Sequence, residues 1–390
     1  MKELKLYSPL QVDIIDRDDP GHVIPLQAVN HEQGPQYLSQ IVNVLQGLQS
    51  HEDARNAFTA PNQDWSEICE KICSCTRSTE LINGRLYGVY SCRSSGELDA
   101  DEVDALKWYC QDRWEHDGWG EGYAHCPRES PSLGLYIHYW QDDGAPLLTR
   151  EQLETVRRVE QSRPAVTEVT PDTFWMLIEQ TKDVYGQEQG ASAYWLTEQL
   201  LAMGPEQTLN FHNIMHGYME LADKYGLWNA ANLIQNEILY RDGFEDFRTW
   251  LIAQGKDVYF AALKDPDSLA DISDCEDCQC EDLLYVGDMA HERLTGRMIN
   301  DDTDPAAHRQ LIAELRQDIV YGAEIGYPHE WSELAAYLPR LTARFLTPEK
   351  LRESARRVQL WNHDDPDIQK ARAAAPKKKK SRQNKGGDAR

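Results

Sequence analysis

The order of apolar and polar positions divides the chain into a first part with strands and a second part that is helical. Residues 4–16 are rich in β-branched and aromatic residues, which predicts a strand, and Pro9 inside it favours a sheet edge or a bulge. Residues 34–49 carry apolar side chains at the period of an amphipathic helix, and a shorter helix is expected over residues 65–72. The first part therefore mixes strands with helices.

The strongest local signal in this part is Asn83-Gly84. This pair supplies the positive-φ positions of a type I′ turn and precedes a β-rich run over residues 85–92, so we expect a hairpin. A capping-box spacing at Asp99 predicts the start of a helix. A closing aromatic strand follows at residues 133–140. Strands paired through a hairpin, with helices between them, indicate an antiparallel sheet.

From residue 172 onward the pattern is helical almost throughout, with breaks at glycine and proline residues. We therefore expect an α+β N-terminal domain, with an antiparallel sheet and helices, followed by a mostly all-α domain and a disordered basic C-terminal tail. The expected boundaries are 1–141 for the α+β domain, 142–171 for a linker with a solvated helix, 172–345 for the helical domain and 346–390 for a helical extension with the basic tail.

Composition narrows the class of protein. The chain is 41% hydrophobic, and no stretch reaches the roughly 18 uninterrupted apolar residues of a membrane span, so we expect no membrane insertion. The first residues lack the apolar core of a secretory signal, which favours the cytoplasm. Nine cysteines, an odd number without the spacing of a disulfide scaffold, fit a compartment where thiols stay reduced.

The formal net charge of −25 is unevenly distributed, because residues 368–390 contain nine Lys or Arg against one Asp. An acidic body repels nucleic acid and anionic membranes and attracts basic partners. The tail does the reverse, and a weak contact with nucleic acid is one interpretation of its basic run, while a solvated terminus is the simpler one. That run comprises Lys377, Lys378, Lys379, Lys380 and Arg382.

Several segments resemble the bacterial domain-of-unknown-function family 4240. They are DTFWMLI at residues 172–178, LWNAANLI at 227–234, DGFEDFRTWLIAQGK at 242–256 and LPRLTARF at 338–345. The resemblance spans residues 172–345. Residues 1–140 resemble a separate uncharacterised domain of gut-dwelling Gram-positive bacteria, through LYSPL at residues 6–10, the glycine-rich loop at 117–122 and the closing aromatic strand. Neither resemblance implies an activity.

Two cysteine clusters raise the possibility of a zinc site. Cys275, Cys278 and Cys280 form one cluster, and Cys69, Cys73 and Cys75 form the other. Zinc is held tetrahedrally by four ligands, yet neither cluster contains a second Cys-x-x-Cys pair or a paired histidine motif. We therefore predict no cofactor, keep zinc as the alternative, and favour a reduced, solvent-facing acidic loop for the second-half cluster.

Histidine and carboxylate patterns offer weaker candidates. His212 and His216 are four residues apart and share a helix face, as in His-Glu-x-x-His metalloproteases, but no Glu follows His212, so we favour surface or interior histidines. Asp242, Glu245, Arg248 and Trp250 crowd one helix. Acidic residues at a helix start stabilise its dipole, which is the simpler interpretation, and a cleft holding an anion or another ligand is the alternative.

The glycine-rich loop at 117–122 is the remaining candidate, with Trp119 and Glu121 as possible groove residues. It follows a helix and not a strand, so it lacks the setting of a nucleotide-binding loop. No complete catalytic set is visible. We expect a non-catalytic protein that binds a basic protein partner through its acidic surface. The alternatives are an enzyme using Asp242, Glu245 and Arg248 or a cysteine-bound metal, and weak nucleic-acid binding through the tail.

Overall fold

The computed structural model describes residues 1–16, 23–28, 70–83, 85–116, 122–125, 135–141, 145–185, 189–236, 239–272, 278–326 and 331–346. These residues form two compact units. The first unit comprises Met1–Glu220, Ile252–Lys256 and Cys280–Gln317, and the second comprises Leu221–Leu251, Asp257–Gln279 and Asp318–Arg390. Each unit combines segments that lie far apart in the sequence. The consecutive domain boundaries expected from the sequence therefore stay a prediction.

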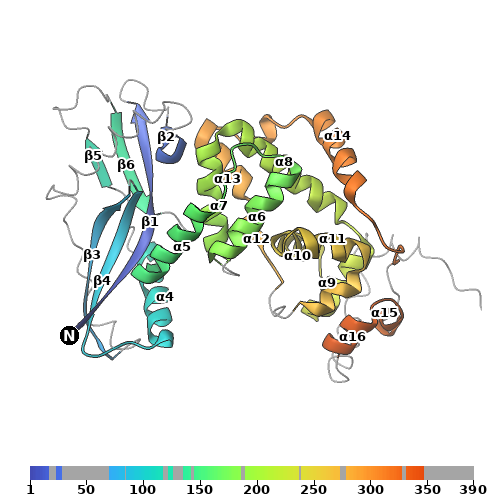
Figure 1. Ribbon diagram of the computed structural model, residues 1–390, viewed down its shortest axis with the longest axis horizontal. Helices are drawn as coiled ribbons and strands as arrows, with labels where there is room; N and C mark the ends of the chain where they lie inside the picture. The colour runs from blue at the N-terminus through green and yellow to red at the C-terminus, as the bar shows by residue number, and fades with distance from the viewer. Residues whose placement is uncertain are drawn as a thin grey trace, which may run out of the picture. The chain divides into compact units, whose positions relative to one another are not determined.

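An antiparallel sheet built around one long strand forms the first part of the chain (Figure 1). Its order is β3-β4-β1-β6-β5, with β2 and β7 also paired to β1. The elements are β1 (Lys2–Asp16), β2 (Val23–Pro25), η1 (Leu26–Ala28), β3 (Ile72–Ile82), β4 (Arg85–Ser94), β5 (Gly122–His125), β6 (Leu135–Gln141) and β7 (Leu148–Thr149). The expected antiparallel sheet with helices is confirmed.

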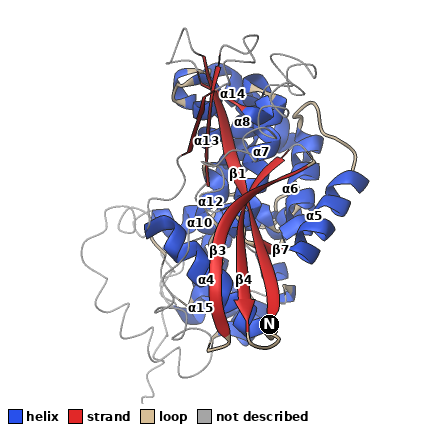
Figure 2. Ribbon diagram, turned by 90° about the vertical axis from the view of Figure 1, so that its left-hand side faces the viewer, coloured by secondary structure: helices blue, strands red, loops and turns tan. Residues whose placement is uncertain are grey.

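Strand β1 is central, so the prediction that Pro9 marks an edge or a bulge is wrong. The first half of β1 pairs with β4 as far as Pro9, and the second half pairs with β6 from Leu10 onward. Figure 2 shows β1 running through both groups of strands. Proline has no N–H to donate to a ladder, and it is tolerated here where the strand changes partner.

The expected hairpin and capping box are both present. Ile82 of β3 pairs with Arg85 of β4, and Asn83 between them has a positive φ of 50°. Helix α4 (Ala100–His116) begins where Asp99 and Glu102 exchange hydrogen bonds, each backbone N–H donating to the other side chain at 2.9 Å. Local sequence therefore determines this β-hairpin and the start of this helix.

The sheet is covered by a different helix on each face. On one face, a buried cluster joins β1 to Leu106 and Cys110 of α4, and its β1 members are Leu6, Leu10, Val12 and Ile14. Tyr7, on the opposite face, packs with the helix α5 (Arg150–Ser162). The expected solvated helix within 142–171 is thus exposed on one side only, because its Leu153 and Val156 are buried against the sheet.

Helices make up the rest of the described chain, as expected. They are α6 (Pro171–Tyr185), α7 (Gln189–Met203), α8 (Pro205–Leu221), α9 (Tyr225–Gln235), α10 (Arg241–Ala253), α11 (Lys256–Lys264), η2 (Pro266–Asp271), α12 (Glu281–Leu284), α13 (Val286–Thr295), η3 (Ile299–Asp301), α14 (Pro305–Leu315), η4 (Arg316–Asp318), α15 (Trp331–Tyr337) and α16 (Pro339–Phe345). Among the helices that the structure describes, none combines the length and apolar character needed to cross a membrane.

A buried carboxylate joins the sheet to the helices of the first unit. Glu198 on α7 is 3% exposed, and its Oε2 accepts a 2.8 Å hydrogen bond from Nη2 of Arg85 on β4. Arg293 of α13 lies 3.6 Å from the other carboxylate oxygen, an ion pair too long for a hydrogen bond. Gln27 of η1 also donates to Glu198. One side chain thereby connects four elements.

Candidate metal centre

Two helices of the first unit bring two imidazoles and a carboxylate together. His212 and His216 are one turn apart on α8, so they project from the same face. Asp288 comes from α13, near its N-terminal end. The ligand atoms that these three residues offer all lie within 4.8 Å of one another. We refer to them as the His–Asp cluster.

A close approach of α13 to α8 at Gly287 brings Asp288 near the histidines. The two imidazole rings have centroids 4.2 Å apart, and Nδ1 of His212 lies 3.3 Å from Oδ2 of Asp288. Gly287 permits this approach, since a Cβ there would be 2.9 Å from Cβ of His212. Real Cβ atoms essentially never come that close, so α13 requires glycine at this contact.

The cluster is sheltered on one side and accessible on the other. His212 is buried, while His216 and Asp288 are half-buried. Burial raises the pKa of the Asp288 carboxyl, but contact with His212 and the nearby charge of His216 more than offset this, and the pKa lies below its usual value. Asp288 is therefore ionised at neutral pH. The pKa of His308 on α14, which is not a member of the cluster, is also lowered, mainly by burial.

This donor set suits a divalent transition metal. Ligands bound to zinc at about 2.1 Å in a tetrahedron lie roughly 3.4 Å apart, so small side-chain rotations would convert the observed spacing into coordination. Two histidines with one carboxylate occur in catalytic zinc sites and in non-haem iron sites. Three protein ligands leave a coordination position for water or a substrate.

The acidic and aromatic candidates on α10 are dispersed between core and surface. Arg248 and Trp250 are buried, Glu245 is half-buried and Asp242 is exposed. Nε of Arg248 donates to the carbonyl of Phe244 at 3.4 Å, and the guanidinium lies 5.0 Å from that ring. Burial lowers the pKa of Arg248, against the raising effect of Asp223 and Glu245. The aromatic residues Phe244, Phe247 and Trp250 are buried and form core.

The described cysteines do not group into the two clusters that the sequence predicts. Cys73 is exposed and Cys75 is buried, because the β3–β4 register shifts between Ile72 and Ser74, which leaves Cys73 as the extra residue of a β-bulge. Cys75 instead lies beside Cys92 and Cys110. Cys278 and Cys280 are buried, so the expected solvent-facing loop is wrong for these two thiols. Thiols behave as small apolar side chains and are commonly buried.

Other candidates lie outside the described residues. These are Trp119, Glu121, Cys69, Cys275, Lys377, Lys378, Lys379, Lys380 and Arg382, together with the expected helix at 34–49 and the C-terminal tail. The expected helix at 65–72 also falls there, except that residues 70–71 form a turn and Ile72 begins β3.

Sequence reasoning missed Asp288 as a partner of the two histidines. The motif typical of such histidine pairs carries its Glu directly after the first histidine, where this chain has Asn213. Asp288 lies on a helix far along the chain, so no local spacing could have indicated it. Its predecessor Gly287 was a weak signal, because a glycine inside a helix costs stability and often marks close packing.

Comparison with known proteins identifies the segment that carries this cluster. Residues 169–293 match the family described as Protein of unknown function (DUF4240). This segment is similar to DUF4240. The match confirms the resemblance seen in the sequence, contains all three residues of the His–Asp cluster, and stops short of the LPRLTARF segment at 338–345. No curated protein and no solved structure is significantly similar to the chain.

Proposed function

We propose that the DUF4240 segment binds a divalent transition metal through His212, His216 and Asp288, and that the protein acts through this ion. The observation that carries the proposal is the convergence of these three ligand atoms within 4.8 Å of one another. Two imidazoles and an ionised carboxylate match the ligand preferences of zinc and ferrous iron.

The local packing supports this role. Gly287 permits the close approach of α13 that brings Asp288 to His212. His216 and Asp288 are half-buried, so a bound ion would remain within reach of a small molecule. The ion would polarise such a ligand or lower the pKa of a bound water. Asp288 would hold the ion with its carboxylate, and the two imidazoles would complete the protein's share of the coordination.

A competition titration tests the proposal. Zinc is added to the full chain in the presence of a chromophoric chelator, for wild type and for the variants His216→Ala and Asp288→Asn. We expect the His–Asp cluster of wild type to withdraw one equivalent from the chelator and each variant to bind this equivalent at least tenfold more weakly. His291 supplies the control, since it forms a separate pair with Asp302 at 3.2 Å.

The control separates ligation from folding. His291→Asn disturbs the pairing of His291 with Asp302 in the first unit and removes none of the three ligands of the cluster, so zinc binding should persist if the variant keeps a cooperative melting transition. Equal zinc affinity in wild type, His216→Ala and Asp288→Asn would refute the proposal. The three side chains would then serve only as a helix-to-helix contact.

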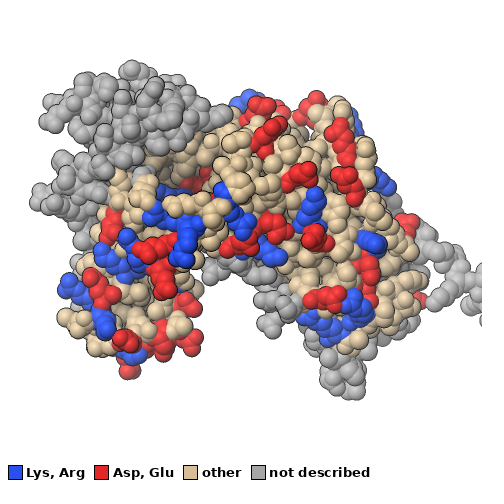
Figure 3. Space-filling model, viewed as in Figure 1, with Lys and Arg blue, Asp and Glu red and all other residues tan. Residues whose placement is uncertain are grey.

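Docking of a basic protein partner is the second proposal, and the net charge of −25 favours it. Acidic and basic side chains are interspersed over the described part of one face (Figure 3), so this proposal draws on net charge and not on a uniform patch. Its test is binding to a polylysine peptide at rising salt. Binding that weakens steeply with salt supports it, and no binding at low salt contradicts it.

A further inference from the structure

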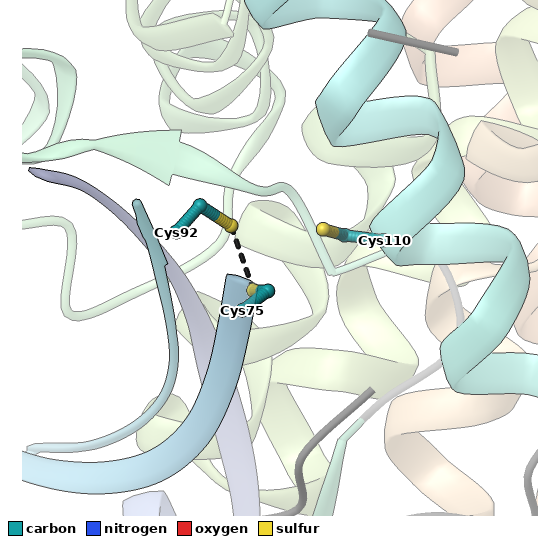
Figure 4. Close-up of side chains that lie close together, drawn as sticks. All are labelled: Cys75, Cys92 and Cys110. Carbon is teal, nitrogen blue, oxygen red and sulfur yellow. Dashed lines mark hydrogen bonds between the residues drawn. The ribbon is translucent and has the colours of Figure 1, made fainter. Parts of the chain in front are cut away.

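Three thiols meet in the core beneath the sheet. Cys75 comes from β3, Cys92 from β4 and Cys110 from α4, and Figure 4 shows their sulfur atoms converging. All three sulfur atoms lie within 4.8 Å of one another, and those of Cys75 and Cys92 are 2.7 Å apart. We call these residues the cysteine triad.

The fold fixes each member of the triad independently. The two-residue turn of the β3–β4 hairpin sets a register in which Cys75 lies directly opposite Cys92. Cys110 lies on the buried face of α4, and its carbonyl accepts a 3.0 Å hydrogen bond from the hydroxyl of Tyr90. The hairpin and the helix thus present their thiols to one point without any loop in the site.

The surroundings of the triad are apolar and dry. Cys75 is 1% exposed, and Cys92 and Cys110 are 0% exposed. Their neighbours in the core cluster include Leu106 and Tyr109 of α4. Within the described residues, the group of possible ligands around this point consists of the three cysteines alone. Such a sulfur-only setting excludes calcium and magnesium, which require oxygen ligands.

We propose that Cys75, Cys92 and Cys110 bind a thiophilic divalent d¹⁰ ion, such as Zn²⁺ or Cd²⁺, as three thiolates. Binding releases one proton from each thiol to solvent and forms three metal–sulfur bonds, which leaves a net charge of −1 on the complex. Without an ion, three buried thiolates would place uncompensated negative charge in an apolar core. The ion therefore supplies the positive charge that thiolates need in a dry core.

This site is separate from the His–Asp cluster, and neither proposal depends on the other. Two further uses of the triad become outcomes of the test. Three neutral thiols can simply fill space as small apolar side chains. Directly opposed strand residues also have a Cα separation of roughly 4.5–5.5 Å, which is compatible with a cross-strand disulfide between Cys75 and Cys92.

Cadmium titration of the fully reduced full-length chain under anaerobic conditions distinguishes these cases. Thiolate-to-cadmium charge transfer in the ultraviolet reports sulfur ligands and is silent for imidazole and carboxylate, so ions in the His–Asp cluster do not contribute. The variants are Cys75→Ser, Cys92→Ser and Cys110→Ser, and Cys73→Ser is the matched control because it lies exposed on the same strand as Cys75.

We expect wild type and Cys73→Ser to show the same absorption at one bound equivalent, and each triad variant to lose at least a third of it. Absorption that is absent in wild type, or unchanged in the triad variants, overturns the proposal. Unchanged absorption would locate the thiolates elsewhere, for example among Cys275, Cys278 and Cys280.

A second measurement covers variants that fail to fold. The ¹¹³Cd chemical shift of wild type reports the number of sulfur ligands without any substitution. A shift typical of three sulfur ligands supports the site, and a shift typical of oxygen or nitrogen ligands alone overturns it. Peptide mapping of untreated protein that finds Cys75 linked to Cys92, with no cadmium bound after reduction, also overturns it in favour of a disulfide.

Discussion

Burial divides the cysteines of one strand into accessible and protected thiols. Cys73 is exposed, whereas Cys75 faces the core two residues later. The pKa of Cys92 is raised by its thiol neighbour Cys75 and by burial, despite an opposing contact with Cys110. The reactive species is the thiolate, so a buried thiol with a raised pKa reacts slowly.

We predict that brief alkylation of the native protein at mildly alkaline pH labels Cys73 and leaves Cys75, Cys92 and Cys110 unlabelled. All four should react after unfolding in denaturant. Peptide mass spectrometry before and after unfolding measures the difference. Equal labelling of Cys73 and Cys92 in the native state would show that the sheet core opens far more readily than its burial implies.

The contact between α8 and α13 depends on Gly287, which has no side chain. A Cβ at Gly287 would come within 2.9 Å of Cβ of His212, and this neighbour cannot move aside as the end of a flexible side chain would. We predict that Gly287→Ala separates the two helices and lowers stability by about 1–3 kcal/mol, less any gain in helix propensity. Zinc affinity of the His–Asp cluster should fall at the same time.

Urea denaturation and the chelator titration measure these two effects. Gly326→Ala is the matched control, because a Cβ there meets no atom within 4 Å. Full zinc affinity in Gly287→Ala, with unchanged stability, would mean that α13 can shift without disturbing the cluster.

Glu198 connects the sheet to the helices through buried charge. It contacts Arg85 and Arg293 while its own side chain is 2% exposed. We predict that Glu198→Gln costs on the order of 3 kcal/mol, because it removes the buried carboxylate charge that pairs with the half-buried Arg85 and Arg293. Glu154→Gln, which removes an exposed ion pair with Arg150 on α5, should cause no measurable change. Equal effects of the two substitutions in urea denaturation would contradict this account.

Elements set by local chemistry could be predicted from sequence, and those set by distant contacts could not. The Asn83 turn and the Asp99 capping box formed as expected because their signals lie within a few residues. The central place of β1 depends on partners far along the chain, so Pro9 gave a wrong indication. Likewise, the exposed face of α5 could be predicted from the sequence, but the burial of its Leu153 and Val156 beside Tyr7 could not.

The same distinction applies to the two sites. The pairing of Ile82 with Arg85 sets a hairpin register that places Cys75 opposite Cys92, although the sequence predicted a cluster of Cys75 with Cys69 and Cys73 instead. The addition of Cys110 required the packing of α4 on the sheet. The His–Asp cluster needed the packing of α13 on α8, which no periodicity in either helix specifies.

At the scale of the whole molecule, the chain combines a DUF4240 segment with an antiparallel sheet that precedes it. Both contain, within the described residues, a cluster of side chains that could hold a metal ion, one of nitrogen and oxygen donors and one of sulfur donors. This difference in chemistry predicts two ions of different preference and permits each to be followed separately.

Cobalt titration followed by visible absorption tests the central claim most directly, because Co²⁺ reports the geometry and the donor atoms of a zinc site. The account predicts d–d bands at one equivalent in the Cys75→Ser/Cys92→Ser/Cys110→Ser variant, without the near-ultraviolet band of thiolate ligation. These bands should disappear when Asp288→Asn and His216→Ala are added to that variant. Bands that persist without these two ligands, or that never form while the folded protein is intact, would contradict a metal centre at His212, His216 and Asp288.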